Sequence, residues 1–392
     1  MDYCPNNSAN NKKLWRILIG TVYVKKFNER GNGLLRLADR CLGIPLIYLI
    51  SPFGHSGQEK ARKRIFPAKT GIFCPGAIGD LLFTSILIDG IRRSEPQAFV
   101  EIIASEANAQ ALPFLQADRN SIFPITRPDK IINYIRRQNF DIFIDTSQWS
   151  RLGALISAFS GARLTVGFNT PSQHRHMLYD IPVKHSSNVH ELENFLALGR
   201  SVWPDFSGKP VLRVPKSLTK RKFICCHMRA APGKNSCLKE WPDAHWVELI
   251  EDIKKEYHVF LVGSGRDFLK NKNFMERHFN KDKKVHILKP RKLWQLAVFF
   301  AKASALISVN TGIMHLAAFM ELPTIGLHGP TNPLRWGPAG KNCVSLSPES
   351  GVYGYLNLGF EFPPHVKSCM EFLTVRQVKE ALHSLLSRQV QF

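Results

Sequence analysis

Two glycine-bearing turns, each between an apolar run and the start of a helical pattern, hold residues that can do chemistry. In the first, the segment GAIGD (76–80) follows a short apolar run, and the helical pattern continues to Arg93. Asp80 therefore falls in the first helical turn, where the helix dipole stabilises a carboxylate. A carboxylate that faces a cleft can act as a general base, although aspartate at this position often serves only as a helix cap.

The second turn, NTG (310–312), separates a strand-like run from a helix expected over 313–320. Thr311 can act as the N-cap, and the amides of Gly312, Ile313 and Met314 would then point at an anion such as a phosphate. Gly312 lets that anion approach the backbone closely. The alternative is an ordinary strand-turn-helix connection with a capping threonine, because one glycine in a turn is weak evidence.

Both turns lie in segments that resemble a known family. The run NTGIMHLAAFMELPTIGLHGPTNPLRWGPAG (310–340) is similar to the C-terminal signature of the bacterial lipopolysaccharide heptosyltransferases, glycosyltransferase family 9, and CPGAIGDLLFTSILIDGIRR (74–93) resembles their N-terminal motif. The resemblance extends from about residue 70 to the C-terminus, and residues 1–69 lie outside it. It implies an α/β fold of the glycosyltransferase-B type, with two Rossmann-like, doubly wound domains facing a cleft.

The resemblance implies catalytic roles at matching positions. Asp80 becomes the general base that takes the proton of the acceptor hydroxyl as its oxygen attacks the anomeric carbon, with Gly79 beside it on the acceptor side. The family carries a basic residue ahead of a Trp-Pro pair, against the phosphates of the donor. Lys239 matches this position, and Arg229 and Lys234 are nearby alternatives. A solvated lysine ahead of a buried tryptophan is the competing interpretation.

The nucleotide side of the expected site departs from the family in one respect. Many members carry aspartate where this chain has Asn310, and an amide cannot act as a base, which favours Asp80. His315 could donate to a phosphate or a sugar hydroxyl, although a lone helical histidine is more often structural. Asp267 resembles the acid that binds sugar hydroxyls in relatives. The expected nucleotide-sugar-binding residues are Asn310, Thr311, Gly312, Met314, His315 and Asp267.

The segment QHRH (173–176) has two interpretations. With His185 and His190 it suggests a metal site, but no cysteine or carboxylate cluster accompanies it. The resemblance instead implies metal-independent transfer without a cofactor, so a basic loop on the acceptor side is favoured, and a solvated loop without a role remains open. The acceptor-binding residues expected here are His174, Arg175 and His176.

Charge and cysteine content limit the class of protein. The chain has 392 residues, 44% hydrophobic and 21% charged, which is typical of a folded globular protein. Its net charge of +22 indicates an anionic partner: nucleic acid, phospholipid headgroups or a phosphorylated substrate. The eight cysteines form no C-x-x-C pair and several lie in apolar runs, which favours buried free thiols in a reducing cytosol.

From residue 70 onward, short apolar runs alternate with helical patterns, as in doubly wound sheets that bind ligands at their strand ends. We expect a basic, partly amphipathic extension over 1–69, an acceptor-side domain over 70–205 and a nucleotide-sugar-binding domain over 206–370. A C-terminal helix in 371–392 could cross back onto the first domain.

The extension 1–69 holds thirteen basic and four acidic residues. Its apolar run Cys41–Ile50 is well short of the roughly 20 residues that span a bilayer. An interfacial amphipathic segment on an anionic membrane surface is one interpretation. A basic extension packed on the first domain is the other.

The resemblance implies an inverting glycosyltransferase that moves heptose, or a related sugar, from a nucleotide-diphosphate donor such as ADP-heptose. The acceptor would be the lipopolysaccharide core or a lipid A-linked sugar, at the cytoplasmic side and in peripheral contact with the inner membrane. The alternatives are a non-catalytic relative, which Asn310 supports, and a basic nucleic-acid-binding protein. Nucleic acid is not expected as a partner, because no DNA- or RNA-binding module is recognisable.

Overall fold

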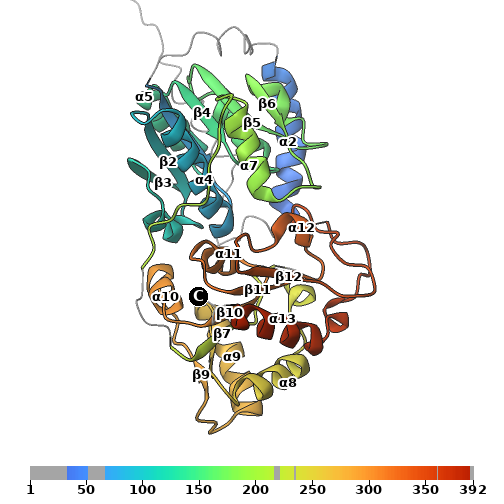
Figure 1. Cartoon of the computed structure of the whole chain (residues 1–392). Helices are drawn as coiled ribbons and strands as arrows, with labels where there is room; N and C mark the ends of the chain where they lie inside the picture. The colour runs from blue at the N-terminus through green and yellow to red at the C-terminus, as the bar shows by residue number, and fades with distance from the viewer. Residues whose placement is uncertain (1–32, 52–66, 216–220, 234, 360, 389–392) are drawn as a thin grey trace, which may run out of the picture.

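The chain forms two α/β domains stacked one above the other, each built on a six-stranded sheet (Figure 1). The computed structural model describes residues 33–51, 67–215, 221–233, 235–359 and 361–388. Most of the basic extension, together with Lys234, lies outside the described residues. Among the helices described, none combines the length and apolar content needed to cross a bilayer.

The N-terminal sheet has the strand order β3-β2-β1-β4-β5-β6, and all its pairs are parallel. Its strands are β1 (Lys69–Cys74), β2 (Phe99–Ser105), β3 (Arg119–Phe123), β4 (Ile142–Asp145), β5 (Leu164–Asn169) and β6 (Ile181–Lys184). Its helices are α4 (Ile78–Ser94), η2 (Ala109–Phe114), α5 (Pro128–Gln138), α6 (Arg151–Ala158), η3 (Arg175–Leu178) and α7 (Glu191–Arg200).

The C-terminal sheet, β12-β11-β10-β7-β8-β9, is also parallel throughout. Its strands are β7 (Phe223–His227), β8 (His258–Leu261), β9 (Val285–Ile287), β10 (Ala305–Val309), β11 (Thr324–Leu327) and β12 (Cys343–Leu346). Its helices are η4 (Ser236–Lys239), α8 (Asp243–Ile253), α9 (Gly265–His278), α10 (Leu293–Phe300), α11 (Gly312–Phe319), α12 (Pro333–Trp336), η5 (Met370–Phe372) and α13 (Val375–Ser387).

Both sheets have the strand order of a Rossmann fold, which confirms the predicted α/β class with two doubly wound domains. Every residue of the central strands β4, β7 and β10 is buried, as expected of parallel strands covered by helices on both faces. In each sheet the order reverses at one point, between β1 and β4 and between β7 and β10. Ligands bind in the crevice at such a point, so these four strands position the site.

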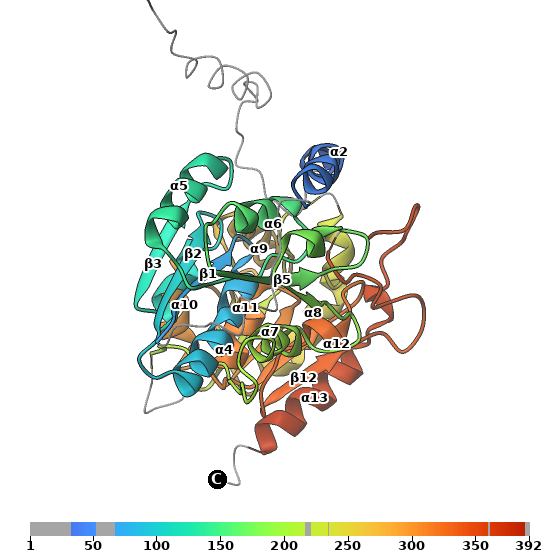
Figure 2. The same cartoon turned by 90° about the horizontal axis from the view of Figure 1, so that it is seen from above.

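Part of the extension forms helix α2 (Gly33–Ile50), which lies along the edge of the N-terminal domain (Figures 1 and 2). It packs against α6 and η3, and the guanidinium of Arg151 holds the carboxylate of Asp39 at 2.9 Å with both side chains largely buried. This agrees with an extension packed on the first domain. Leu37, Tyr48 and Leu49 of α2 are nevertheless exposed.

Four elements differ from the sequence prediction. Residues 106–115 belong to the alternating pattern described above and were expected to form an α-helix, but the structure has the 3₁₀ segment η2 there, because Pro113 within it cannot continue an α-helix. Strands β6 and β12 were not expected; each is four residues long and only partly buried, so its apolar pattern is weak. The C-terminal helix α13 does not cross back: Val375, Val378, Leu382 and Leu385 bury against the C-terminal domain.

Part of the segment that connects the two domains packs on the N-terminal domain. Phe206 packs where Gly90 of α4 and Gly199 of α7 leave room for its ring, since a Cβ on either glycine would lie 2.1–2.2 Å from a ring carbon. The amide of Arg213 donates to the carbonyl oxygen of Phe114 at 2.7 Å. Residues 206–213 therefore pack on the first domain, although the sequence placed them in the second.

Candidate active site

A cavity of about 2160 Å³ opens between the two domains. Its wall contains the segments that follow β1, β4 and β10, namely 75–80, 146–150 and 310–313, and His227 at the end of β7. Pockets for drug-sized ligands measure roughly 300–1,000 Å³, so this cavity has room for two substrates together.

Asp80 is the third residue of α4 and is 3% exposed. Its Oδ2 accepts the amide of Ala77 at 2.7 Å, and its Oδ1 accepts Nε2 of Gln148 at 3.1 Å. A Cβ on Gly76 would lie 2.3 Å from Oδ2, which explains the glycine there. The carboxylate thus caps its helix and also lines the cavity. An ionised carboxylate has about four lone-pair sites, so acceptor capacity remains for a substrate hydroxyl.

Thr311 occupies the predicted N-cap position of α11, but its hydroxyl makes no capping bond and instead contacts Nδ1 of His227 at 3.2 Å. The amide of Met314 donates to the carbonyl oxygen of Thr311 at 3.1 Å, and Met314 is not part of the cavity wall. Gly312 and Ile313 do line the wall, and amides of a first turn have no acceptor one turn earlier. The geometry therefore supports Gly312 and Ile313 as anion donors, but not Met314.

The first turns of α4 and α11 meet across the domain boundary. A Cβ on Gly312 would lie 3.0 Å from the amide nitrogen of Gly79, and a Cβ on Gly79 would lie 3.2 Å from Cδ2 of His315, so close packing favours glycine at both positions. The ring of His315 packs edge-on against Phe83 with centroids 4.8 Å apart, and His315 also lines the cavity. The structure thus brings Asp80 and the first amides of α11 together in one cavity, as a base and an anion site require.

The sequence model of glycosyltransferase family 9 (heptosyltransferase) matches residues 129–352, more than half of the chain. The chain belongs to glycosyltransferase family 9. Lipopolysaccharide heptosyltransferase 2 of Salmonella typhimurium is 21% identical over 356 residues, covering 80% of this chain and 97% of that protein. Lipopolysaccharide heptosyltransferase 1 of Pseudomonas aeruginosa is 34% identical over 116 residues, 29% of this chain and 32% of that protein.

Solved structures of the family share the fold of this family 9 chain. The Escherichia coli ADP-heptose lipopolysaccharide heptosyltransferase II has a TM-score of 0.65 at 21% identity, covering 82% of this chain and 99% of that one. The family 9 glycosyltransferase of Veillonella parvula has a TM-score of 0.69 at 16% identity, covering 82% and 98%.

Of the candidate cations in this family 9 chain, Lys239 and Arg229 line the cavity. The Arg229 guanidinium is nearly buried, with Nη1 3.3 Å from Glu240 Oε2 and 3.1 Å from Asp243 Oδ1. Lys239 lies at the end of η4 with its Nζ 5.6 Å from the centroid of the Phe362 ring. Because two carboxylates already neutralise Arg229, Lys239 is the better candidate to compensate phosphate charge.

The turn before α9 repeats the construction of the turn before α4. Asp267 is again the third helical residue, and its Oδ2 accepts the amide of Ser264 at 2.7 Å and its hydroxyl at 2.8 Å. It lines the cavity, as does His227. Burial lowers the pKa of His227 to about 4, against a smaller opposing effect of Asp267. His227 is therefore neutral near pH 7 and adds no charge to the phosphate side.

The remaining predicted residues have structural partners. Asn310 lines the cavity, and its side-chain amide nitrogen Nδ2 donates to the backbone carbonyl oxygen of Trp336 at 2.9 Å. Arg175 is fully buried, with Nη2 2.8 Å from Asp145 Oδ2 and in contact with Tyr179. His174 and His176 are likewise absent from the cavity wall. Segment 173–176 was expected to bind the acceptor, and these contacts do not support that prediction, because its Arg175 neutralises a buried carboxylate.

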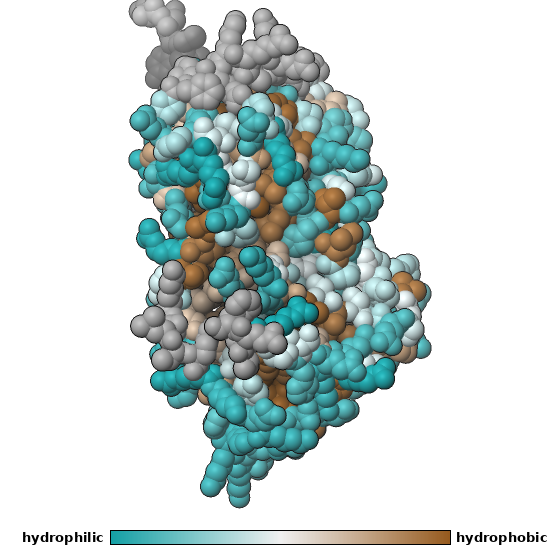
Figure 3. Space-filling view, in the orientation of Figure 1, coloured by the Kyte–Doolittle hydropathy of each residue, from teal (hydrophilic) through white to brown (hydrophobic). Residues whose placement is uncertain are grey.

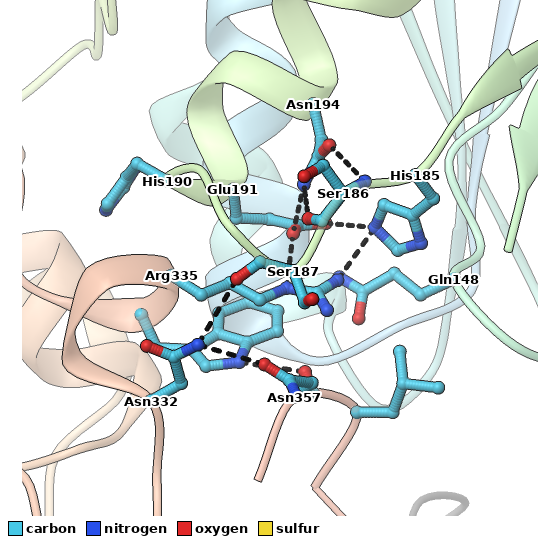
Figure 4. Close-up of polar contacts among 12 residues, drawn as sticks. Gln148, His185, Ser186, Ser187, His190, Glu191, Asn194, Asn332, Arg335 and Asn357 are labelled. Atoms are coloured by element: carbon cyan, nitrogen blue, oxygen red, sulfur yellow. Dashed lines mark hydrogen bonds and ion pairs between the residues drawn. The ribbon is translucent and has the colours of Figure 1, made fainter. Parts of the chain in front are cut away.

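Gln148 is a cavity residue that the sequence did not single out. It begins a chain of contacts that runs from Asp80 to the domain boundary. The hydroxyl of Thr170 donates to the backbone carbonyl oxygen of Gln148 at 2.5 Å, and the same Oγ1 of Thr170 lies 2.8 Å from His185 Nδ1. His185 Nε2 lies 2.7 Å from Arg335 Nη2 (Figure 4). Its position after β4, at the switch point, is the signal that could have identified it.

Arg335 of the C-terminal domain forms a buried ion pair with Glu191 of the N-terminal domain, Nε to Oε2 at 2.8 Å (Figure 4). Burial alone would raise the pKa of Glu191, but contacts with His185 and Arg335 outweigh it and lower this pKa to about 2. The domains are thus joined by a charged contact without access to water.

In the part of the chain that is described, no group of three or more His, Cys, Asp or Glu side chains could hold a metal ion.

Proposed function

We propose that this glycosyltransferase is inverting and transfers heptose from a nucleoside-diphosphate donor, with ADP-heptose preferred, to the lipopolysaccharide core or a lipid A-linked sugar. The observation that carries the proposal is that the first turn of α4, which contains Asp80, meets the first turn of α11 in one interdomain cavity. Structures similar in fold, those of the E. coli heptosyltransferase WaaC, hold ADP and ADP-2-deoxy-2-fluoro heptose.

In the proposed reaction, Asp80 accepts the proton of the acceptor hydroxyl while that oxygen attacks the anomeric carbon from the face opposite the diphosphate. The bond from the anomeric carbon to the diphosphate oxygen breaks, and its electron pair stays on the diphosphate. The amides of Gly312 and Ile313, the dipole of α11 and Lys239 stabilise this charge. Attack opposite the leaving group inverts the anomeric configuration, and we propose that no metal ion is needed.

We also propose that the protein works at the cytoplasmic face of the inner membrane, in peripheral contact with it. The support is the excess of basic residues in 1–69 and the exposed apolar side chains of α2. Anionic headgroups attract each nearby Lys or Arg by about 1 kcal/mol.

Asp80→Asn tests the catalytic assignment, because the amide keeps the shape of the side chain but cannot accept the proton. We expect turnover of ADP-heptose to fall at least about 100-fold, since general bases contribute 10²–10⁴-fold. ADP at 100 times its dissociation constant should still stabilise the variant by about 2.7 kcal/mol in thermal unfolding. The matched control is Glu193→Gln, a half-exposed first-turn acid of α7 that pairs with Arg200 and lies outside the cavity wall, which should keep turnover. Turnover retained by Asp80→Asn would end the assignment.

A further inference from the structure

The interdomain cavity has two ends of different chemistry. Where the two domains meet, its wall contains the polar and charged side chains described above, together with apolar residues of the C-terminal domain such as Leu358 and Phe362. Its other end is enclosed by α2, α5 and α6 of the N-terminal domain, and its side chains are mostly apolar. The apolar residues that line this end, here called the α2 arm, are Leu42, Leu46, Ile50, Ile125, Ile132, Leu152, Leu155, Ile156 and Phe159.

The apolar surface of the α2 arm is accessible. Leu42 is 52% exposed, Leu46 39% and Phe159 45%, although α2 and α6 pack against each other. Figure 3 shows apolar side chains at the surface of the upper domain, between hydrophilic ones. Single exposed leucines are common, but apolar side chains gathered in a concave wall indicate a binding site for something apolar.

Helix α2 is held firmly enough to form such a wall. Besides its ion pair with Arg151, the carboxylate of Asp39 accepts the amide of Arg151 at 2.9 Å, at the start of α6. Gly43 lets the two helices approach, because a Cβ there would lie 2.8 Å from Cδ of Arg151. The α2 arm is therefore part of the fold and not an accidental gap beside a loose segment.

We propose that the α2 arm binds the hydrocarbon part of an amphiphilic acceptor, namely an acyl chain of an anionic glycolipid. The inference rests on the proposed function, because the arm belongs to the same cavity as Asp80 and its occupant must continue to the reacting hydroxyl. Arg36 lines the arm and suits an anionic headgroup, whereas the charge of Arg127, which also lines it, is neutralised by Asp129. The acids Asp39 and Asp129 line it too, but each is in an ion pair, with Arg151 and Arg127 respectively.

Binding of the fluorescent fatty acid cis-parinarate to the full chain tests the arm without any donor. Because a buried leucine contributes about 1.5–3 kcal/mol, Leu42→Gln and Leu46→Gln should each weaken parinarate binding about tenfold. Phe159→Gln, on a different element, should do the same. The matched control Leu49→Gln changes a residue of α2 that is 67% exposed and outside the cavity wall, and it should leave binding unchanged.

Equal binding by all four variants, or no binding by the unmodified protein, would overturn the proposal. The proposal would also be overturned if all variants partitioned more weakly onto anionic phospholipid vesicles while parinarate binding stayed unchanged. That result would show that α2 binds the membrane surface. If a segment of the chain itself fills the arm, the variants lower the melting temperature and parinarate does not bind, and the proposal fails in that case too.

A transfer assay separates this inference from the proposed function. With an acylated acceptor, Leu46→Gln should raise KM about tenfold and leave kcat unchanged, whereas with the deacylated acceptor both should match the unmodified protein. Equal KM changes for both acceptors would overturn the hydrocarbon site while transfer itself stands. Absence of transfer to either acceptor would contradict the proposed function, and parinarate binding would still decide whether the arm takes hydrocarbon.

Discussion

Single residues at the site serve both folding and chemistry. Asp80 satisfies the amide of Ala77 as a helix cap does, and the same carboxylate lies in the cavity wall. Its type and its place after a strand made it a candidate from the sequence. For Gln148 the signal was weaker, namely its position after β4, because its importance comes from contacts with Asp80 and Thr170, which are distant in the sequence. Arg175 misled for the opposite reason: its charge suggested a ligand, but its partner is buried Asp145.

Gly312→Ala tests whether the contact between α4 and α11 matters. The new Cβ would lie 3.0 Å from both the amide nitrogen of Gly79 and the side chain of Ile78, so one helix must shift. We expect kcat to fall about tenfold or more, because small misplacements of reacting groups are costly. Gly265→Ala is the matched control at the first residue of α9, where nothing lies within 4 Å of the added Cβ. Equal kinetics for both variants would contradict this role.

At the scale of elements, the sequence predicted those that are buried and regular. The strand expected at 305–309 is β10, and the helix expected at 313–320 is α11 at 312–319, because apolar periodicity is strong in both. Weakly patterned elements such as β6 and β12 were missed. The side of the molecule on which α13 packs depends on which apolar faces meet in three dimensions, and the pattern of one helix does not contain this information.

The connecting segment 206–213 offers a test at this scale. Phe206→Ala should lower the free energy of unfolding by about 3–5 kcal/mol, because the ring fills a space that Gly90 and Gly199 leave between α4 and α7. Urea unfolding monitored by circular dichroism measures this. Phe372→Ala, at a ring that is 46% exposed, should cost much less. Similar losses in both variants would show that Phe206 does not anchor the connection.

At the scale of the whole molecule, the buried ion pair between Glu191 and Arg335 ties the domains together. Arg335→Met should destabilise the protein by about 3–5 kcal/mol, since it leaves a buried carboxylate without its cation. Adding Glu191→Gln should recover most of the loss. Arg93→Met, in an exposed pair with Asp89, should cost less than about 1 kcal/mol.

The pH dependence follows from the same pair. The pKa of Glu191 is lowered from 4.5, so its contribution is fully present above pH 4.5 and is lost as the pH falls toward 2. Denaturant unfolding across that range should show a steeper loss of stability in the unmodified protein than in Arg335→Met/Glu191→Gln. Parallel curves would contradict the assignment.

The first turns of α4 and α11 touch each other, and their charges affect how strongly the two domains are held together. Both helices present the positive pole of their dipole at the same point, and like poles repel; within these two first turns, Asp80 is the acidic residue that offsets them. If the proposed function holds, a dianionic leaving group bound there would attract both poles at once, and the nucleotide would hold the two domains together more firmly. Small-angle scattering should therefore record a smaller radius of gyration with ADP than without it, and the difference should shrink as salt screens the poles.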